Sequence, residues 1–122
     1  MMMKNVLIAT DGSAHANHVS ELGVELSKNC GEKVFALFVA DVGRYFESMG
    51  VVSWNIADKL IQGIKSEVQE EGENATKKVG EAAKKTRVPI ERKIIEGHPA
   101  DDIMKYAEDI KASVIVVGSI SL

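Results

Sequence analysis

The stretch Val6-Leu7-Ile8-Ala9-Thr10-Asp11-Gly12-Ser13 decides the fold. Its first four residues are all apolar and turn-forming residues follow them, which is typical of a strand buried on both faces of a sheet. Ser13 belongs to the residue types that cap the N-terminus of a helix. The stretch therefore predicts a buried strand that leads through a tight turn into a helix.

The helix is expected to begin directly after this turn. Val19, Leu22, Leu26 and Cys30 recur at spacings of three and four residues, and Gly31 follows as a helix-ending residue. Side chains at this spacing lie on one side of a helix. The pattern therefore predicts one apolar stripe, which should face the core.

Three further strands are predicted downstream. Residues 33–40 repeat the buried-strand signature, and residues 114–117 form the most apolar run of the chain, which favours an interior strand. Residues 90–95 alternate apolar and charged side chains. This alternation is typical of a strand at or near the edge of a sheet.

Two more helices separate these strands. Between about residues 56 and 86 apolar residues follow helical spacing, with charged residues between them that should form the solvated face, and Pro89 lies just beyond. Pro99 suits the first position of the second helix. The predicted inner faces consist of Ile56, Leu60, Ile64, Val68, Ala75, Val79 and Ala83 in the first helix, and of Ile103, Tyr106, Ala107 and Ile110 in the second.

The alternation of strands and helices predicts an α/β domain with an open parallel sheet, right-handed crossovers and helices on both faces. Its length suits a single domain, which we expect to comprise residues 1–122. A strand as apolar as residues 114–117 makes a poor open edge. We therefore expect this strand to be covered, either by residues missing from this chain or by another chain.

Composition and charge exclude several classes of protein. The net charge is −3 at pH 7, whereas a nucleic-acid-binding protein needs a basic face. No run approaches the ~20 apolar residues of a membrane span, and the apolar start of the chain breaks at Asp11 without the cleavage site of a signal peptide. Cys30 is the only cysteine, so no intramolecular disulfide is possible and a cytoplasmic location is expected.

A ligand site is expected where the first and last strands end. In an open parallel sheet, ligands bind beyond the carboxyl ends of the strands, where neighbouring crossovers leave in opposite directions. With the strand order 3-2-1-4, the loops 9–13 and 118–121 meet at this point. Gly12 and Gly118 permit close backbone approach, and the N–H groups at the start of the first helix favour an anion. Asp11 could bind ribose hydroxyls or a metal, or it could simply cap the helix.

Other chemically active residues have more than one interpretation. His15 and His18 lie three residues apart and could bind a metal together, but no cysteine or carboxylate accompanies them at metal-binding spacing, which favours surface positions. His98 could lie at the rim of the crevice or cap the helix that follows it. The loop 41–55 could be a lid or partner surface, or its aromatic side chains could pack over the sheet. These aromatic residues are Tyr45, Phe46 and Trp54.

Several segments occur in a characteristic order over nearly the whole chain. They are residues 6–13, the strand ending at Val39, residues 97–100 with the apolar positions of the helix that follows, and residues 114–119. With these segments the chain resembles the universal stress protein family. The resemblance implies a Rossmann-like domain, which is commonly dimeric. It also implies membership of one of two subtypes, of which one binds ATP and the other does not.

In the ATP-binding subtype, the residues that match Asp11 and Gly118 contact the ribose, and the backbone that matches Val39 contacts adenine. A stretch of the form Gly-x-x-Gly, nine residues, Gly-Ser/Thr holds the phosphates. Gly118 matches its first glycine, Ser121 occupies the place of the second, and the rest of this stretch, the fifth strand and the last helix are absent from this chain. The expected binding residues are Ala9, Thr10, Asp11, Gly12, Ser13, Val39, Gly97, Val117, Gly118, Ser119 and Ser121.

These features favour a protein that binds ATP, ADP or AMP, with Mg²⁺ as a companion ion, and that acts in stress response by regulating a conformation or a partner. We expect a homodimer. The first alternative is an interaction module of the same fold that dimerises without a nucleotide, and the second is a slow ATPase or an adenylyl-transfer enzyme. No catalytic residue is assigned, because no nucleophile and base stand at usable spacing.

Overall fold

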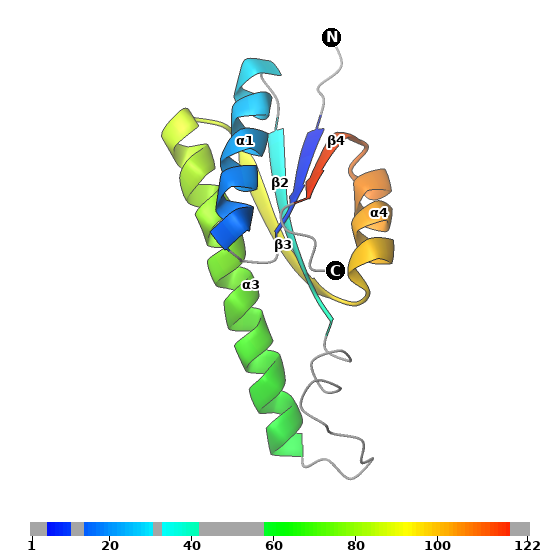
Figure 1. Cartoon of the computed structure of the whole chain (residues 1–122). Helices are drawn as coiled ribbons and strands as arrows, with labels where there is room; N and C mark the ends of the chain where they lie inside the picture. The colour runs from blue at the N-terminus through cyan, green and yellow to red at the C-terminus, as the bar shows by residue number, and fades with distance from the viewer. Residues whose placement is uncertain (1–4, 11–13, 31–32, 42–57, 118–122) are drawn as a thin grey trace.

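Four parallel strands form one open sheet in the order β3-β2-β1-β4. The computed structural model describes residues 5–10, 14–30, 33–41 and 58–117. The strands are β1 (Asn5–Ala9), β2 (Lys33–Ala40), β3 (Ile90–Glu96) and β4 (Ala112–Val117). Helices α1 (Ala14–Cys30) and α3 (Asp58–Thr86) cover one face, and α4 (Pro99–Asp109) covers the other (Figure 1). The predicted α/β class, strand order and two-sided helix arrangement are thus confirmed.

The core lies on both faces of β1, as the apolar run in this strand predicts. Val6 and Ile8 pack with Val79 on the face that α1 and α3 cover. Leu7, between them in the sequence, packs with Ala107 of α4 on the opposite face. Successive side chains of a strand point to opposite faces, so an uninterrupted apolar run is what a two-sided core requires.

The long helix and α4 also agree with the sequence pattern. Helix α3 runs without interruption from Asp58 to Thr86, and α4 begins at Pro99. The described side chains at the predicted inner positions of α3 are buried, namely Ile64, Val68, Ala75, Val79 and Ala83. Those predicted for α4 all belong to the core cluster on its side of the sheet, namely Ile103, Tyr106, Ala107 and Ile110.

The prediction for the inner face of α1 was wrong at Leu22 and Leu26, while the side chains of Val19 and Cys30 lie outside what the structure describes. Leu22 is 57% exposed and Leu26 is 41% exposed. The side of α1 that faces the sheet carries small residues instead, including Gly23 and Ser27. A Cβ atom on Gly23 would lie 2.7 Å from Cδ1 of Ile8, so only a glycine lets the helix approach the sheet this closely. The stripe of large apolar residues therefore marks the flank of the helix and not its core side.

The two edges of the sheet differ in character. Edge strand β3 exposes Glu91, Arg92 and Lys93, and charged side chains protect an edge against pairing with other strands. The predicted interior strand is instead the opposite edge, because β4 pairs with β1 on one side and with no other strand of the described sheet. Ile115 and Val117 on β4 are more than a third exposed. Among the described strands, β4 therefore pairs on one side only, in spite of its apolar run.

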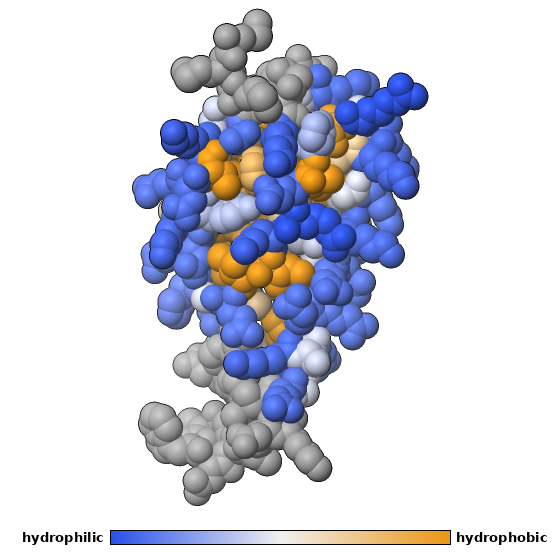
Figure 2. Space-filling view, turned by 180° about the vertical axis from the view of Figure 1, so that it is seen from behind, coloured by the Kyte–Doolittle hydropathy of each residue, from blue (hydrophilic) through white to orange (hydrophobic). Residues whose placement is uncertain are grey.

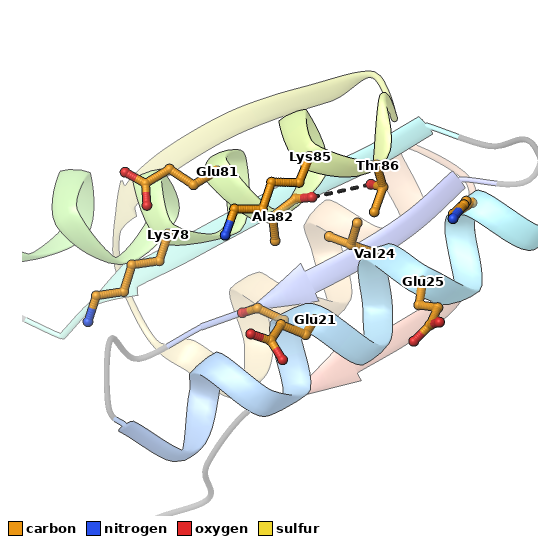
Figure 3. A pocket seen from close by; sticks show the side chains of 10 residues that line it. Glu21, Val24, Glu25, Lys78, Glu81, Ala82, Lys85 and Thr86 are labelled. Atoms are coloured by element: carbon orange, nitrogen blue, oxygen red, sulfur yellow. Dashed lines mark hydrogen bonds between the residues drawn. The ribbon is translucent and has the colours of Figure 1, made fainter.

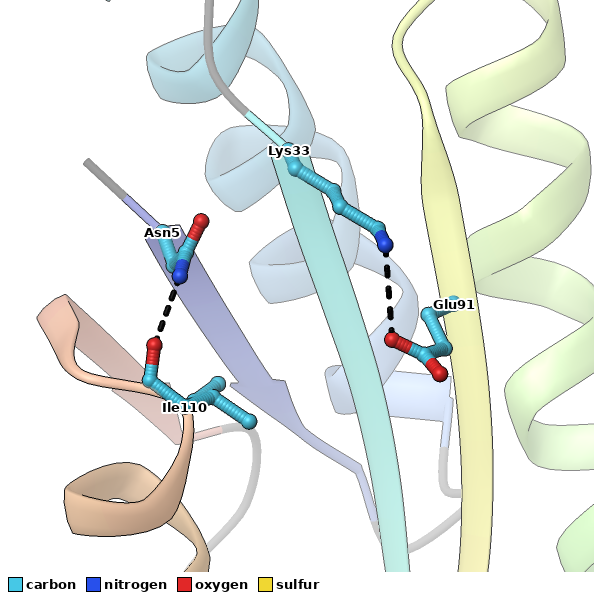
Figure 4. A network of polar contacts seen from close by, with 4 residues as sticks. All are labelled: Asn5, Lys33, Glu91 and Ile110. Carbon is cyan, nitrogen blue, oxygen red and sulfur yellow. Dashed lines mark hydrogen bonds and ion pairs between the residues drawn. The ribbon is translucent and has the colours of Figure 1, made fainter. Parts of the chain in front are cut away.

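Polar contacts join the elements at the amino edge of the sheet. The Asn5 side-chain amide donates a hydrogen bond to the Ile110 carbonyl oxygen at the end of α4, at 2.6 Å (Figure 4). Lys33 on β2 and Glu91 on β3 form an ion pair with 3.4 Å between Nζ and Oε2. Burial, and then the negative charge of Glu91, raise the pKa of the nearby Tyr106 hydroxyl above its ordinary value. These contacts tie α4 and β3 to the sheet on the side opposite to the predicted ligand site.

The surface seen from behind the view of Figure 1 is mainly hydrophilic. Figure 2 shows separate small apolar patches on this side, surrounded by hydrophilic residues. Isolated patches of this kind are normal on protein surfaces and do not by themselves mark a docking site. In the part of the chain that the structure describes, no helix combines the length and apolar character of a membrane span.

Candidate functional site at the carboxyl edge of the sheet

The ends of β1 and β4 lie side by side. Ala9 of β1 is in register with Val117 of β4 on one side and with Leu37 of β2 on the other. All of these strands are parallel, so their carboxyl ends lie at the same edge of the sheet. The backbone N–H of Thr10 donates to the Leu37 carbonyl oxygen at 2.9 Å, which continues the pairing of β1 and β2 by one residue. The sequence prediction that the first and last strands end next to each other is therefore confirmed.

Five of the predicted binding residues are described at this edge, namely Ala9, Thr10, Val39, Gly97 and Val117. Thr10 is buried, and Val39, on neighbouring β2, is in register with Ile95 of β3 and contributes to the core on the α4 side. Ala9 and Val117 are direct register partners. Six others, Asp11, Gly12, Ser13, Gly118, Ser119 and Ser121, lie outside the described residues. Their predicted contacts with a ligand remain predictions.

Gly97 lies at the same edge but farther from β4. It follows β3, and its backbone N–H donates to the Ala40 carbonyl oxygen at 2.9 Å, so β2 lies between it and β1. A Cβ atom on Gly97 would collide with the carboxylate of Asp102. A side chain at position 97 would displace the Asp102 carboxylate from its hydrogen bond with His98, so a glycine is favoured here without any ligand.

The start of α4 is capped by Asp102 and not by a histidine side chain. His98 occupies the N-cap position, but its side chain makes no capping hydrogen bond. The Asp102 carboxylate instead accepts a hydrogen bond of 2.7 Å from the backbone N–H of His98. His98 thus stands at the capping position, as one of the two interpretations of the sequence expected, but its side chain does not make the cap. The sequence does contain an indication of this cap, because acidic residues near the start of a helix often accept hydrogen bonds from its first N–H groups.

The histidine pair His15 and His18 belongs to α1, but the placement of these side chains lies outside what the structure describes. Within residues 5–10, 14–30, 33–41 and 58–117, no group of three or more His, Cys, Asp or Glu residues is arranged to hold a metal ion. The aromatic residues of the loop 41–55 also fall outside the described ranges.

Sequence reasoning missed a groove on the face of the sheet that α1 and α3 cover. It lies between α1 and α3, and charged residues of both signs from each helix line it (Figure 3), namely Glu21, Glu25 and Lys28 of α1 and Lys78, Glu81 and Lys85 of α3. The charges of α3 were predicted to be only a solvated face, because the pattern within one helix does not reveal which residues a second helix places opposite them. The groove is separate from the strand ends described above.

The chain thus has the open parallel α/β architecture. In proteins of this architecture, ligands generally bind at the carboxyl edge of the sheet. The model of the universal stress protein family matches residues 2–122. The chain belongs to the universal stress protein family, and its Rossmann-like fold agrees with this membership.

Two relatives support this assignment. A universal stress protein of Methanocaldococcus jannaschii is 31% identical over 118 residues, covering 97% of this chain and 65% of that protein. A universal stress protein of Bacillus subtilis is 30% identical over 123 residues, covering 97% of this chain and 80% of that protein. The chain thus spans about two thirds of the first relative and four fifths of the second.

Solved structures share the fold at lower identity. A universal stress protein from Archaeoglobus fulgidus in complex with dAMP has a TM-score of 0.66 and 19% identity, covering 95% of this chain and 80% of that one. A family protein from Arabidopsis thaliana with AMP bound has a TM-score of 0.68 and 17% identity, covering 95% and 76%. A universal stress protein in complex with cAMP has a TM-score of 0.61 and 15% identity, covering 94% and 72%.

Proposed function

We propose that this chain binds an adenine nucleotide at the carboxyl edge of β1 and β4. The observation that carries the proposal is the register pairing of Ala9 with Val117, because the two strands end side by side where the predicted binding loops begin. Three structurally similar proteins hold cAMP, AMP or dAMP, which supports an adenine nucleotide as the ligand class.

The proposed ligand is ATP, ADP or AMP, and Asp11 is the proposed ribose-binding residue. A carboxylate that accepts two hydroxyl hydrogen bonds would hold the sugar, while the N–H groups at the start of α1 would face the phosphates. Mg²⁺ would accompany the triphosphate. The protein would act in stress response in the cytoplasm by changing its conformation or its affinity for a partner when the nucleotide binds, and not by chemical turnover.

Calorimetric titration tests this proposal. We expect saturable binding of ATP and AMP, each measured with and without Mg²⁺, and we expect Asp11→Asn to weaken binding by about 10- to 100-fold, because hydrogen bonds to a charged group contribute roughly 1.5–3 kcal/mol. Asp109→Asn is the matched control, since this residue is exposed at the end of α4, at the opposite edge of the sheet. Absence of heat at near-millimolar nucleotide, or equal binding by both variants, would contradict the proposal.

A second candidate function is self-association as an interaction module, favoured by the edge of β4 that pairs with no other described strand. Ile115 and Val117 are exposed there, and an edge strand leaves every second backbone N–H and C=O group unpaired. Helix α1 packs against β4 through Gly23, and its exposed residues Leu22 and Leu26 lie on the flank directed away from α3. These features suit a homodimer in which the β4 strands of two copies pair.

Sedimentation velocity of the whole chain tests the homodimer. We expect Ile115→Lys to raise the dimer dissociation constant by at least about tenfold, because a charge on an edge strand opposes strand pairing. Met104→Lys is the control, since it places the same charge at an exposed apolar position of α4. A monomeric wild-type chain at all concentrations, or an equal shift in both variants, would reject this candidate without affecting the nucleotide proposal.

A further inference from the structure

A β-bulge limits the regular part of β4 to its last four residues. The register of β4 relative to β1 shifts by one residue between Asn5 and Val6, which leaves Ser113 as the additional residue of the bulge. A bulge bends a strand and interrupts its regular pairing. The stretch 114–117 keeps a regular register with β1 and pairs with no other described strand (Figure 1). It is therefore the part of β4 that can accept a further strand.

This edge suits a second copy of the chain. The strand contains no charged residue, and Val114, Ile115 and Val117 are each more than a third exposed. A second copy supplies an identical apolar strand, which pairs antiparallel about a twofold axis. The same axis would bring the α1 helices of the two copies together on one face of the joined sheet. Leu22 and Leu26 are exposed on the flank of α1 directed away from α3, so these apolar side chains would also be covered.

Antiparallel pairing brings the start of one β4 strand to the end of the other. Lys111 lies three residues before Val114 in the sequence. Where Val114 pairs with Val117 of the second copy, Lys111 therefore comes to lie three positions beyond that Val117. A strand rises about 3.3 Å per residue, so the lysine stands within about 10 Å of the strand end. This is the carboxyl edge of the second copy, where its nucleotide is proposed to bind.

Lys111 is an exposed cation in the turn between α4 and β4. Its backbone has φ 55°, and its N–H donates to the Glu108 carbonyl oxygen at 3.1 Å. Neither of the ion pairs found in the described part of the chain involves its side chain. Asp109 is the nearest acidic residue in the sequence, but it belongs to α4, which covers a face of the sheet (Figure 1). The residue that directly precedes the strand thus carries a positive charge available to an anion.

We propose that Lys111 of a second copy reaches the nucleotide at the carboxyl edge of β1 and β4 and pairs with its phosphate groups, which rests on the proposed nucleotide function and on the dimer joined at β4. Each dimer would hold two such sites, each built from the strand ends of one copy and the lysine of the other. The lysine arrives only in the dimer, so nucleotides would bind the dimer more tightly than the monomer. By thermodynamic linkage, nucleotides would in turn strengthen the dimer. Adenosine, which has no phosphate, would do neither.

Calorimetric titration of Lys111→Gln, at a chain concentration above the dimer dissociation constant, tests the contact with phosphate. ATP and AMP should bind about tenfold more weakly than to wild type, because a hydrogen bond between charged groups is lost. Adenosine should bind both chains equally. Lys105→Gln is the matched control, since it removes the same charge from an exposed position of α4 and should bind ATP as wild type does. Equal ATP binding by Lys111→Gln and wild type would overturn the proposal.

Mixing two defective chains tests whether the lysine acts across copies. Asp11→Asn lacks the proposed ribose ligand but keeps Lys111, whereas Lys111→Gln lacks the lysine but keeps Asp11. A mixed dimer contains one site with both groups. Adding an excess of the Asp11→Asn chain to the Lys111→Gln chain should therefore restore ATP binding of wild-type affinity at one site per mixed dimer. A lysine that acts within its own chain predicts no recovery, and that result would overturn the proposal.

Sedimentation velocity with and without ATP measures the linkage. ATP should lower the dimer dissociation constant of wild type and leave that of Lys111→Gln unchanged. The failures are distinguishable. A wild-type chain that binds no nucleotide would refute the proposed function together with this inference. Nucleotide binding by a chain that stays monomeric, or by a dimer that ATP does not strengthen, would refute the inference alone.

Discussion

Replacing Leu7 by alanine is expected to lower the free energy of unfolding by about 2–5 kcal/mol, the usual cost of removing a large buried side chain and leaving a cavity. Leu7 is fully buried and packs with Leu37 and Ala107 between the sheet and α4. Domains of this size are stable by only about 5–15 kcal/mol, so much of the stability would be lost. Urea denaturation followed by circular dichroism measures the change.

The matched control for Leu7→Ala is Met104→Ala. Met104 is also a large apolar residue, but it is 57% exposed on α4. Its replacement should change the free energy of unfolding by less than about 0.5 kcal/mol. If the two variants were equally stable, the position of Leu7 in the core between the sheet and α4 would be incorrect.

Replacing Gly23 by alanine is expected to destabilise the protein by about 1–3 kcal/mol, although alanine is the better helix former. The added Cβ atom would lie 2.7 Å from Cδ1 and 2.8 Å from Cγ1 of Ile8, a side chain that is itself fully buried and has little room to move. The helix or the strand would have to shift. Thermal unfolding of the variant, compared with wild type, measures this cost.

Gly63→Ala in α3 separates packing from helix propensity. Nothing lies within 4 Å of a Cβ atom at this exposed position. The substitution should therefore stabilise the protein, by up to about 1 kcal/mol. Opposite signs for the two glycine variants are expected, and a stabilising effect of Gly23→Ala would show that α1 does not approach the sheet as closely as described.

The sequence pattern predicts most of this fold because the strands are continuous apolar runs and the long helix has a regular period. Residues 6–9 and 114–117 are strands, as their apolar runs predict, although the second of them is partly exposed at an edge of the sheet. The observed strand order is the one expected for right-handed crossovers with helices on both faces. The inner face of α1 could not be predicted in the same way. Close packing there selects Gly23 and Ser27 for their small size, which no hydropathy pattern reveals.

The position of the candidate site could be predicted from the sequence, because it depends only on where the strands end. That Ala9 and Val117 are neighbours follows from topology alone. The role of Asp102 beside Gly97 depends on the rotamer of one side chain. The charged groove depends on how α1 and α3, which are distant in the sequence, face each other. Such relations arise only when the elements are placed in three dimensions.

In the described sheet, the contrast between a charged β3 edge and an apolar β4 edge would limit the size of an assembly formed by strand pairing. Two copies joined at β4 would form a single eight-stranded sheet related by a twofold axis, and both ends of that sheet would carry Glu91, Arg92 and Lys93. Neither end would then accept another strand readily. Growth would stop at two molecules, and the apolar edge would not seed a fibre.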